Sequence, residues 1–276
     1  MKRILLPFVA LAALVLPSCL QQHTTITLNQ DGSGTIVEET VFGAQMSAML
    51  GGLGGLGGGE DAKDPLKDLM SPDKAKARAA KLGEGVTVEK TEAIDADGKK
   101  GARVTYHFAD INKVKFTDST DAMGEALGDG MPAPAGADKP KADKKPTTFK
   151  YVDNVLTITN PDDEKVAKED KEEAAEEGGD DPQAAQMEAM MKGMMADMKI
   201  SLKLVIPAGI AETNATHVDG NTITLAEMDM GKIMETPGAF KKLQGAGQDS
   251  EKAMAALKDV KGVKMEAKKA ITVKVK

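Results

Sequence analysis

The chain has 276 residues but carries 28 Gly, 12 Pro, 6 Phe, 2 Tyr and no Trp, so less of it can pack into a core than its length suggests. A formal charge of -7 and the scarcity of aromatic side chains argue against a nucleic-acid partner and against an aromatic carbohydrate cleft. One Cys and 3 His exclude an internal disulfide and a multi-cysteine metal site and leave little material for catalysis, so we expect no enzyme and no cofactor.

The N-terminus has the features of an export signal. Met1, Lys2 and Arg3 form a basic start, and residues 4–16 are uncharged but too few to span a bilayer permanently. Residues 16–19, Leu-Pro-Ser-Cys, then resemble a lipobox, which predicts a lipoprotein signal peptide over 1–18 and acylation of Cys19 as the first mature residue. The alternative is an ordinary secretory signal cleaved after Ser18, with a free thiol at Cys19.

The residue after the cysteine bears on the location of the protein. It is Leu20 rather than Asp, which in a diderm host indicates sorting to the outer membrane, with the protein facing the periplasm. No later apolar run approaches the roughly 20 residues of a membrane-spanning helix. We therefore expect the membrane to be contacted through the N-terminal lipid anchor.

Three segments have the composition of linkers. Residues 51–59 are a glycine repeat, residues 121–146 are rich in Pro, Ala, Gly and Lys, and residues 161–182 hold eleven carboxylates against three lysines. Such segments bury too little apolar surface to offset their ordering entropy. We predict a single α+β domain over 19–276 with disordered insertions near 51–64, 121–146 and 161–182.

Strand patterns fill the segments between these insertions. Alternating or β-rich runs are separated by turns of Gly, Asn and Asp, and they predict four strand pairs and a closing strand: 24–28 with 35–42, 86–94 with 102–108, 148–152 with 155–159, 200–206 with 221–225, and 271–275. Residues 95–98, Asp-Ala-Asp-Gly, are expected to form a hairpin turn rather than a calcium loop.

Helix signals are fewer. Ser71, Pro72 and Gly83 bracket a helix over 73–82, a second helix is predicted over 183–198, and a third runs from a cap at Asp249 or Ser250 to Val260. A shorter turn opens at 236–237. Hairpins mixed with a few helices predict the α+β class, with an antiparallel sheet and helices packed on one face.

The helix predicted over 183–198 carries a methionine stripe on one face, made of Met187, Met190, Met191, Met194, Met195 and Met198. Thioethers are soft ligands, so the stripe could bind Cu(I) or Ag(I). Because continuous helical spacing is what burial requires, packing against the sheet is the favoured interpretation. A Met-rich face that adapts to a partner or a lipid is a third.

Two other features have simple structural interpretations. His107 is expected to be a solvent-facing strand residue, since no second metal-ligating residue lies at a suitable spacing. The C-terminal lysines could contact anionic headgroups or protect an edge strand from aggregation, and the second use is the commoner: Lys264, Lys268, Lys269, Lys274 and Lys276.

Residues 24–41 (TTITLNQDGSGTIVEETV), the Met-bearing helix and residues 199–225 (KISLKLVIPAGIAETNATHVDGNTITL) together resemble the LppM-like family of bacterial lipoproteins. In that family a strand ends in Pro-Gly, an Asn follows, and a Gly turn leads into another strand. Pro207, Gly209, Asn214, Gly220 and the strand at 223–225 match in this order. The resemblance implies a lipoprotein with an α+β fold and carries over no catalytic residues.

The sequence therefore predicts a lipid-anchored bacterial envelope protein with a non-enzymatic binding or scaffolding role. Its partners would be the membrane and an envelope protein or lipid. One alternative is a carrier of lipids or apolar ligands, with a groove between the Met-rich helix and the sheet. The other is a Cu(I) binder that uses the methionine stripe.

Overall fold

The computed structural model describes residues 20–44, 46–48, 70–116, 146–160, 197–236, 238–239, 260–266 and 268–276. Cys19 and the predicted signal peptide lie outside these residues, as do the predicted insertions at 51–64 and 161–182 and all but Pro146 of the insertion at 121–146. Only the last two residues of the helix predicted over 183–198 are described, and they are not helical. The helix predicted to end at Val260 is described at that residue alone.

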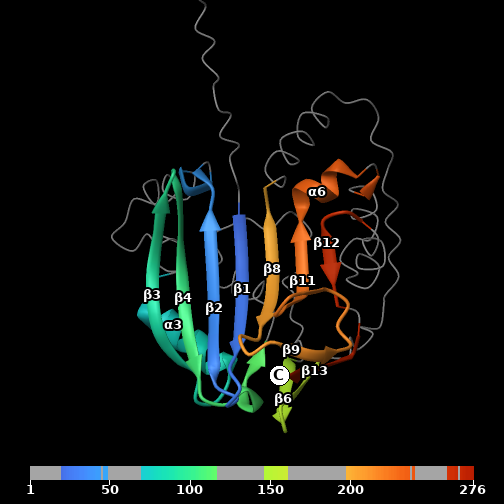
Figure 1. Ribbon diagram of the computed structural model, residues 1–276. Coiled ribbons are helices and arrows are strands. Elements are labelled where there is room, and N and C mark those ends of the chain that lie inside the picture. The colour runs from blue at the N-terminus through green and yellow to red at the C-terminus, as the bar shows by residue number, and fades with distance from the viewer. Residues whose placement is uncertain are drawn as a thin grey trace, which may run out of the picture.

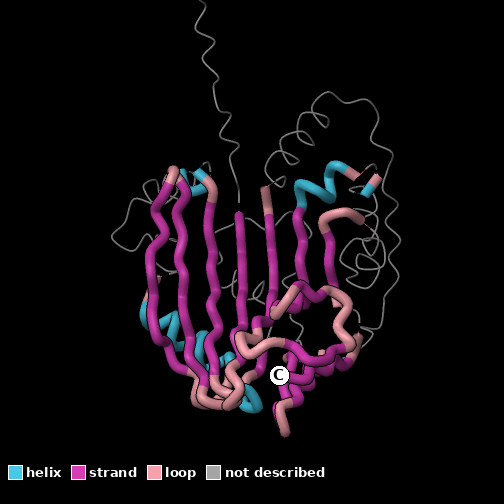
Figure 2. Tube along the Cα trace, viewed as in Figure 1, coloured by secondary structure: helices cyan, strands magenta, loops and turns pink. Residues whose placement is uncertain are grey.

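The larger of two sheets has eight strands (Figures 1 and 2). Its strand order is β10-β11-β8-β1-β2-β4-β3, and β12 pairs with β11. The strands are β1 (Leu20–Leu28), β2 (Gly34–Phe42), β3 (Thr87–Ala96), β4 (Lys99–Phe108), β8 (Lys199–Val205), β10 (Val218–Asp219), β11 (Thr222–Asp229) and β12 (Val263–Met265).

The smaller sheet has five strands in the order β5-β6-β7-β13-β9 and lies beyond the lower ends of the long strands in Figure 1. Its strands are β5 (Lys115–Phe116), β6 (Thr147–Val152), β7 (Val155–Thr159), β9 (Ile210–Thr213) and β13 (Ala270–Val275). The described residues form mostly strands and few helices. This confirms the α+β fold that the sequence predicted.

Helix α3 (Pro72–Leu82) confirms the helix predicted over 73–82. Ser71 is its N-cap residue, Pro72 opens it, and Gly83 follows it with a φ of 138°. Its buried side chains are Ala75, Ala79 and Leu82, which form one face. This face packs against the larger sheet, behind β3 and β4 in Figure 1.

Two short helical elements were not predicted from the sequence. The 3-10 helix η1 (Ile111–Lys113) is capped by Asp110, which accepts a hydrogen bond from the Asn112 N–H. Helix α6 (Met230–Glu235) follows β11 directly, and its cap Asp229 accepts from the Lys232 N–H. Burial raises the pKa of Asp229, but the hydrogen bonds from Lys232 and Lys199 lower it overall.

Three of the predicted hairpins are confirmed, and their turns have the expected chemistry. β3 and β4 are joined at Asp97 and Gly98, with φ of 55° and 74°, and β6 and β7 at Asp153 and Asn154, with φ of 51° and 59°. Positive φ at both central residues is the mark of a type I′ turn. Residues 95–98 therefore form the hairpin turn that the sequence predicted.

The larger sheet is not wholly antiparallel, because β1 pairs in parallel with β8. The fourth predicted pair, β8 with β11, does form, but it is not a simple hairpin. Between these two strands the chain leaves the larger sheet, forms β9 of the smaller sheet and returns through β10. The segment between β8 and β11, which the sequence predicted as one long turn, therefore links the two sheets.

The C-terminal strand also differs from expectation. β13 lies between β7 and β9, so it is an inner strand, and Lys274, its one lysine, does not protect a sheet edge. Lys264 lies on β12, outside β13, and the Lys268 ammonium donates to the Asn214 carbonyl. Edge protection was inferred from local sequence, which does not reveal which strand will pair beside β13.

One apolar core joins both sheets and α3. It contains Ile26, Leu28 and Ile36 of the larger sheet, Leu156, Ile158 and Ile271 of the smaller one, and Leu82 of α3. An ion pair fastens α3 to the sheet at the edge of this core: Arg78 Nη2 lies 2.6 Å from Glu38 Oε1, and both side chains are about nine-tenths buried. Burial, followed by the charge of Glu38, raises the pKa of Tyr106 beside this pair.

Candidate functional site

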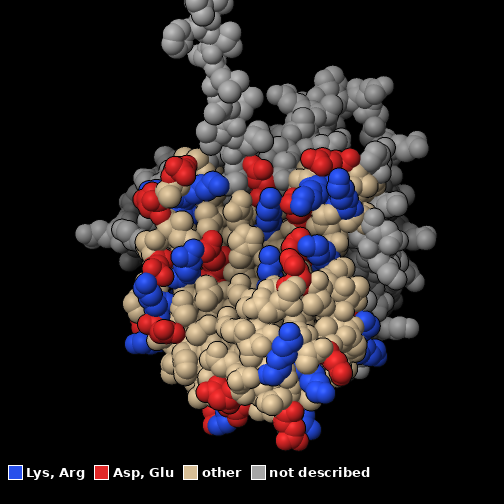
Figure 3. Space-filling view, viewed as in Figure 1, with Lys and Arg blue, Asp and Glu red and all other residues tan. Residues whose placement is uncertain are grey.

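The face of the larger sheet opposite α3 is an extended polar surface (Figure 3). Side chains alternate between the two faces along each strand, so residues in cross-strand register share a face. On this outward face one residue from each of seven strands lies in a single cross-strand row, in spatial order Glu92, Arg103, Glu39, His23, Ser201, Glu227 and Lys264. Figure 3 looks onto this face, where acidic and basic side chains are interspersed.

Charged neighbours along the cross-strand row form ion pairs within the chain. Arg103 Nη2 lies 2.6 Å from Glu39 Oε2, and Lys264 Nζ lies 3.2 Å from Glu227 Oε1. Lys203 lies 4.0 Å from the other Glu227 oxygen. Arg103 and Lys264 are exposed, so each pair is open to solvent and to a partner.

His23 is the central residue of the row, on the central strand of the sheet. Its Nδ1 lies 2.8 Å from Ser201 Oγ, and Ser201 is only 7% exposed. Desolvation lowers the pKa of His23, with Lys203 and Lys199 acting in the same direction and Glu39 and Glu227 against it. The imidazole is therefore neutral at neutral pH, and the centre of the row carries no charge.

Among the described residues, the His23–Ser201 pair lacks the orienting carboxylate of a catalytic triad. Glu39, the neighbouring carboxylate, binds Arg103 rather than the imidazole, and no other carboxylate of the described residues hydrogen-bonds to His23. Ser201 sits on a flat strand within the sheet. In the triad arrangement a carboxylate orients the general base that activates the serine, and no described carboxylate does this for His23.

Small β-branched side chains lie beside the row on β1 and β2, on the side nearer the smaller sheet, and the strands next to them add long side chains that include Lys203 and Lys90. Thr25 pairs with Val37 and Lys203, and Val37 pairs with Thr105. One step further along the strands, Thr27 lies between Thr35 and Val205. The compact side chains are therefore concentrated on the central strands β1 and β2.

The predicted site residues are only partly described. Cys19 and five members of the methionine stripe, Met187, Met190, Met191, Met194 and Met195, lie outside the described residues. Met198 is described and is half-buried against a second apolar cluster, formed by Met230, Ile233, Ala239 and Val260. Met228 and Met234 pack against the same cluster, so methionines from β11, α6 and the start of β8 meet there.

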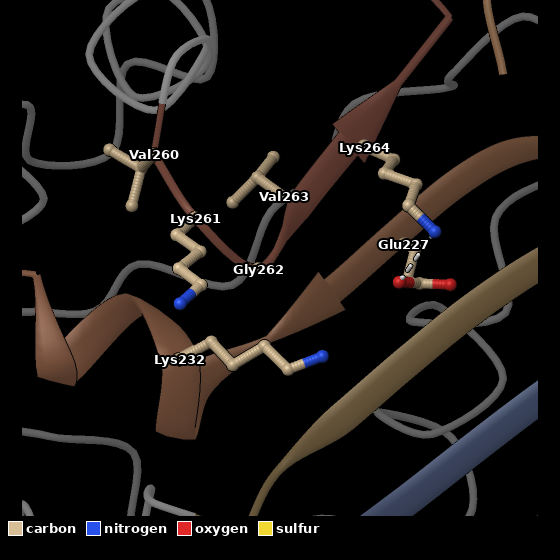
Figure 4. A pocket seen from close by; sticks show the side chains of 7 residues that line it. All are labelled: Glu227, Lys232, Val260, Lys261, Gly262, Val263 and Lys264. Carbon is tan, nitrogen blue, oxygen red and sulfur yellow. Dashed lines mark ion pairs between the residues drawn. The ribbon is translucent and has the colours of Figure 1, made fainter.

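A shallow depression of about 430 Å³ lies beside this second cluster, between α6 and β12 (Figure 4). It is lined by Glu227, Lys232, Val260, Lys261, Gly262, Val263 and Lys264. Two of its three lysines are already paired: Lys232 lies 3.5 Å from Asp229, and Lys264 lies 3.2 Å from Glu227. The charged lining is unlike an apolar ligand pocket.

Two other features are absent from the described residues. They contain no cluster of three or more His, Cys, Asp or Glu side chains placed to hold a metal ion. No helix in this part of the chain combines the length and the apolarity that a bilayer crossing requires. His107, the other histidine of the outward face, is exposed, as predicted.

Sequence reasoning missed the cross-strand row. Each member was visible only as a polar residue in an alternating strand, and nothing local brings His23 next to Ser201, which is 178 residues away. The one signal was the alternation itself, since it predicts that each strand presents a polar face. The register between strands, which sets the order of the charges, comes from tertiary structure.

Comparison with solved structures finds distant similarity. The structure is similar to the NMR structure of the folded domain of LppM from Mycobacterium tuberculosis, with 11% sequence identity over 83% of this chain and 90% of that chain and a TM-score of 0.31. No family model matches the chain, and no curated protein matches it. Membership of the LppM-like family therefore stays a prediction.

Proposed function

We propose that this chain is a non-enzymatic, lipid-anchored protein of the cell envelope that binds a protein partner through the outward face of its larger sheet. The observation that carries this proposal is the cross-strand row, which presents charges of both signs on a rigid seven-strand platform. Ordered, interspersed charges give specificity of association and steer encounter. The arrangement of His23 and Ser201 supports a binding role rather than catalysis.

The position of β1 supports anchoring at Cys19. β1 begins at Leu20, the next residue, so an acylated cysteine would be attached directly to the central strand of the sheet. Mass spectrometry of the native protein should find an acylated N-terminal peptide that begins at Cys19. A free thiol on an unmodified chain would contradict the anchor. In a diderm host we propose the outer membrane, and membrane fractionation tests that location.

The binding role can be tested with a photo-crosslinking amino acid at two positions of the anchored protein. Thr25 lies on the outward face, whereas Val152, 52% exposed, lies on the smaller sheet. We expect a discrete adduct from position 25, abolished by a second substitution of Arg103 to Glu, and no such adduct from position 152. The absence of any specific adduct from position 25 would refute the binding role of this face.

Soft-metal binding is a second candidate, favoured by the meeting of Met198, Met228, Met230 and Met234 at one apolar cluster. Thioethers bind Cu(I) in environments where free thiols are oxidised. A Cu(I) titration in competition with a chromophoric chelator should compare the wild type with a variant in which all four methionines are leucine. Leucine keeps the apolar volume, so the variant should fold and lose only the metal. Equal competition by both proteins, or by neither, would remove this candidate.

The apolar-ligand carrier stays a prediction. Its groove was expected between the Met-rich helix and the sheet, and that helix lies outside the described residues. Delipidation of the purified protein followed by mass spectrometry of the extract is the direct test.

A further inference from the structure

We infer that the protein partner of the outward face is a second copy of this chain, in a two-fold dimer in which the two His23 side chains face each other on the axis. This inference rests on the proposed binding role of the face. It goes further by naming the partner and the alignment of the two copies.

The argument begins with the order of charges in the cross-strand row. His23 is its midpoint, with three residues on either side. The outermost positions are Glu92 and Lys264, of opposite charge, and the next are Arg103 and Glu227, also of opposite charge. The innermost are Glu39, which is paired with Arg103, and the buried Ser201, so the complementarity lies in the two outer positions. The two halves of the row are therefore complementary to each other.

A two-fold axis along the strand direction makes use of this complementarity. Such an axis, lying between two sheets packed face to face, places each position of the row opposite its counterpart across the midpoint. Arg103 of one copy then faces Glu227 of the other, Glu92 faces Lys264, and each contact occurs twice. An axis along the row would instead place every charge opposite its own copy. The charge order thus selects one of the two orientations.

The part of the face beside the row on β1, β2 and β4 suits close sheet-on-sheet packing, whereas β8 carries Lys203 there, which lies 4.0 Å from Glu227. Thr25, Val37 and Thr105 bring compact β-branched side chains to the surface beside the row, and the neutral His23 places no net charge on the axis. Seven strands about 4.8 Å apart and four rows of outward residues give roughly 700 Å² per copy. This approaches the ~800 Å² per partner of a standard specific interface.

The same charges do not reach each other within one chain. Arg103 is on β4 and Glu227 on β11, four strands away, which places them about 19 Å apart at the usual strand spacing. Their intrachain partners are Glu39 and Lys264 instead. Any energetic coupling between Arg103 and Glu227 must therefore arise between copies.

The experiment uses the full mature lipoprotein in density-matched detergent, with association measured by sedimentation equilibrium up to about 100 µM. We expect the wild type to dimerise. Arg103→Glu and Glu227→Lys should each weaken dimerisation by at least about 10-fold, because like charges then face each other twice. Lys150→Glu, an exposed charge reversal on the smaller sheet, is the matched control and should behave as the wild type.

Mixing the two variants is the decisive step. A pair of one Arg103→Glu chain and one Glu227→Lys chain has complementary charges at both contacts, so the mixture should recover dimers that neither variant forms alone. The double variant should also dimerise with itself. Both recoveries follow from the proposed axis and not from damage to the fold of either variant.

Three results would overturn the inference: a monomeric wild type, single variants that dimerise normally, or loss of dimers without recovery on mixing. The proposed binding role would survive these results if crosslinking from Thr25 still gave an adduct with a different protein. An adduct with the mass of two copies would support both proposals.

Discussion

At the scale of single residues, the half-buried environment of His23 makes the stability of the protein depend on pH. Desolvation holds the pKa of His23 in the folded protein below its ordinary value of 6.5. At a pH between the folded-state pKa and 6.5, the unfolded chain therefore binds more protons at this site than the native protein does. The stabilisation from keeping His23 neutral is complete above about pH 6.5 and is lost progressively as the pH falls through that window.

We expect the thermal stability of the wild type to fall below about pH 6.5 more steeply than that of His23→Gln, which has no proton to bind there. Thermal melts between about pH 5 and pH 8 measure this difference. His107→Gln, an exposed histidine on the same face, is the control and should keep the wild-type profile. Parallel profiles for the wild type and His23→Gln would show that desolvation at this site is unimportant.

The structure has no room for a side chain at Gly34. It begins β2 opposite Leu28 and Phe108, and a Cβ added there would collide with the Thr27 carbonyl oxygen and lie 2.6 Å from Phe108 Cζ. The Thr27 backbone and the buried Phe108 ring are closely packed, so neither can move away from an added Cβ.

Gly34→Ala should therefore destabilise the protein by about 3 kcal/mol or more, as seen in urea unfolding. Gly220→Asn is the comparison: nothing lies within 4 Å of a Cβ at this position, and its φ of 60° is one that Asn tolerates. This second variant should lose less than about 1 kcal/mol. Similar losses for the two variants would contradict the steric argument.

At the scale of elements, the attachment of α3 depends on a pair of charges removed from water. Arg78 also lies over the Phe116 ring, 5.8 Å from its centroid, so the guanidinium links α3, β2 and β5. Removing one partner of such a pair leaves an uncompensated charge, whereas replacing both by apolar groups is often neutral.

Arg78→Met should accordingly destabilise the protein by roughly 2–4 kcal/mol, and the double variant with Glu38→Leu should be more stable than Arg78→Met alone. Chemical denaturation at pH 7 compares the two. A double variant that is less stable than the single one would show that the Arg78 stem and its packing matter more than the charge.

Elements with strong local signals were predicted well. The β6–β7 hairpin is encoded by Asp153-Asn154 between two β-rich runs, and α3 by Pro72 and Gly83 at its ends. α6 was missed because its six residues, Met-Gly-Lys-Ile-Met-Glu, include a glycine and continue directly from a strand. β12 has three residues and depends on pairing with β11, which its own sequence does not specify.

At the scale of the molecule, residues 20–160 and 197–276 do not form separate units. In the larger sheet, β8 and β11 extend the sheet beyond β1. In the smaller sheet, β13 pairs with β7 on one side and with β9 on the other. This interleaving explains why the candidate site was not predicted: its residues come from both segments, and their order exists only once the strands have paired.

The interleaving predicts the outcome of a single cut. Proteolysis within 161–182, where the sequence predicts an insertion, should leave two fragments that co-elute in native buffer and separate in denaturant, because β1–β8 and β7–β13 join them. An added site for a specific protease in this segment makes the cut unique, and the uncut chain is the control. Fragments that separate without denaturant would contradict the described pairing.

The parallel pairing of β1 with β8 has a mechanical consequence in the proposed anchored form. Tension on the N-terminal lipid pulls along β1, which is bonded over its whole length to β2 and over seven residues to β8. Because ladder hydrogen bonds lie across the strand, such a pull loads both ladders together in shear rather than opening one bond at a time. The strand attached to the proposed anchor is thus held by a ladder on each side against force along its length.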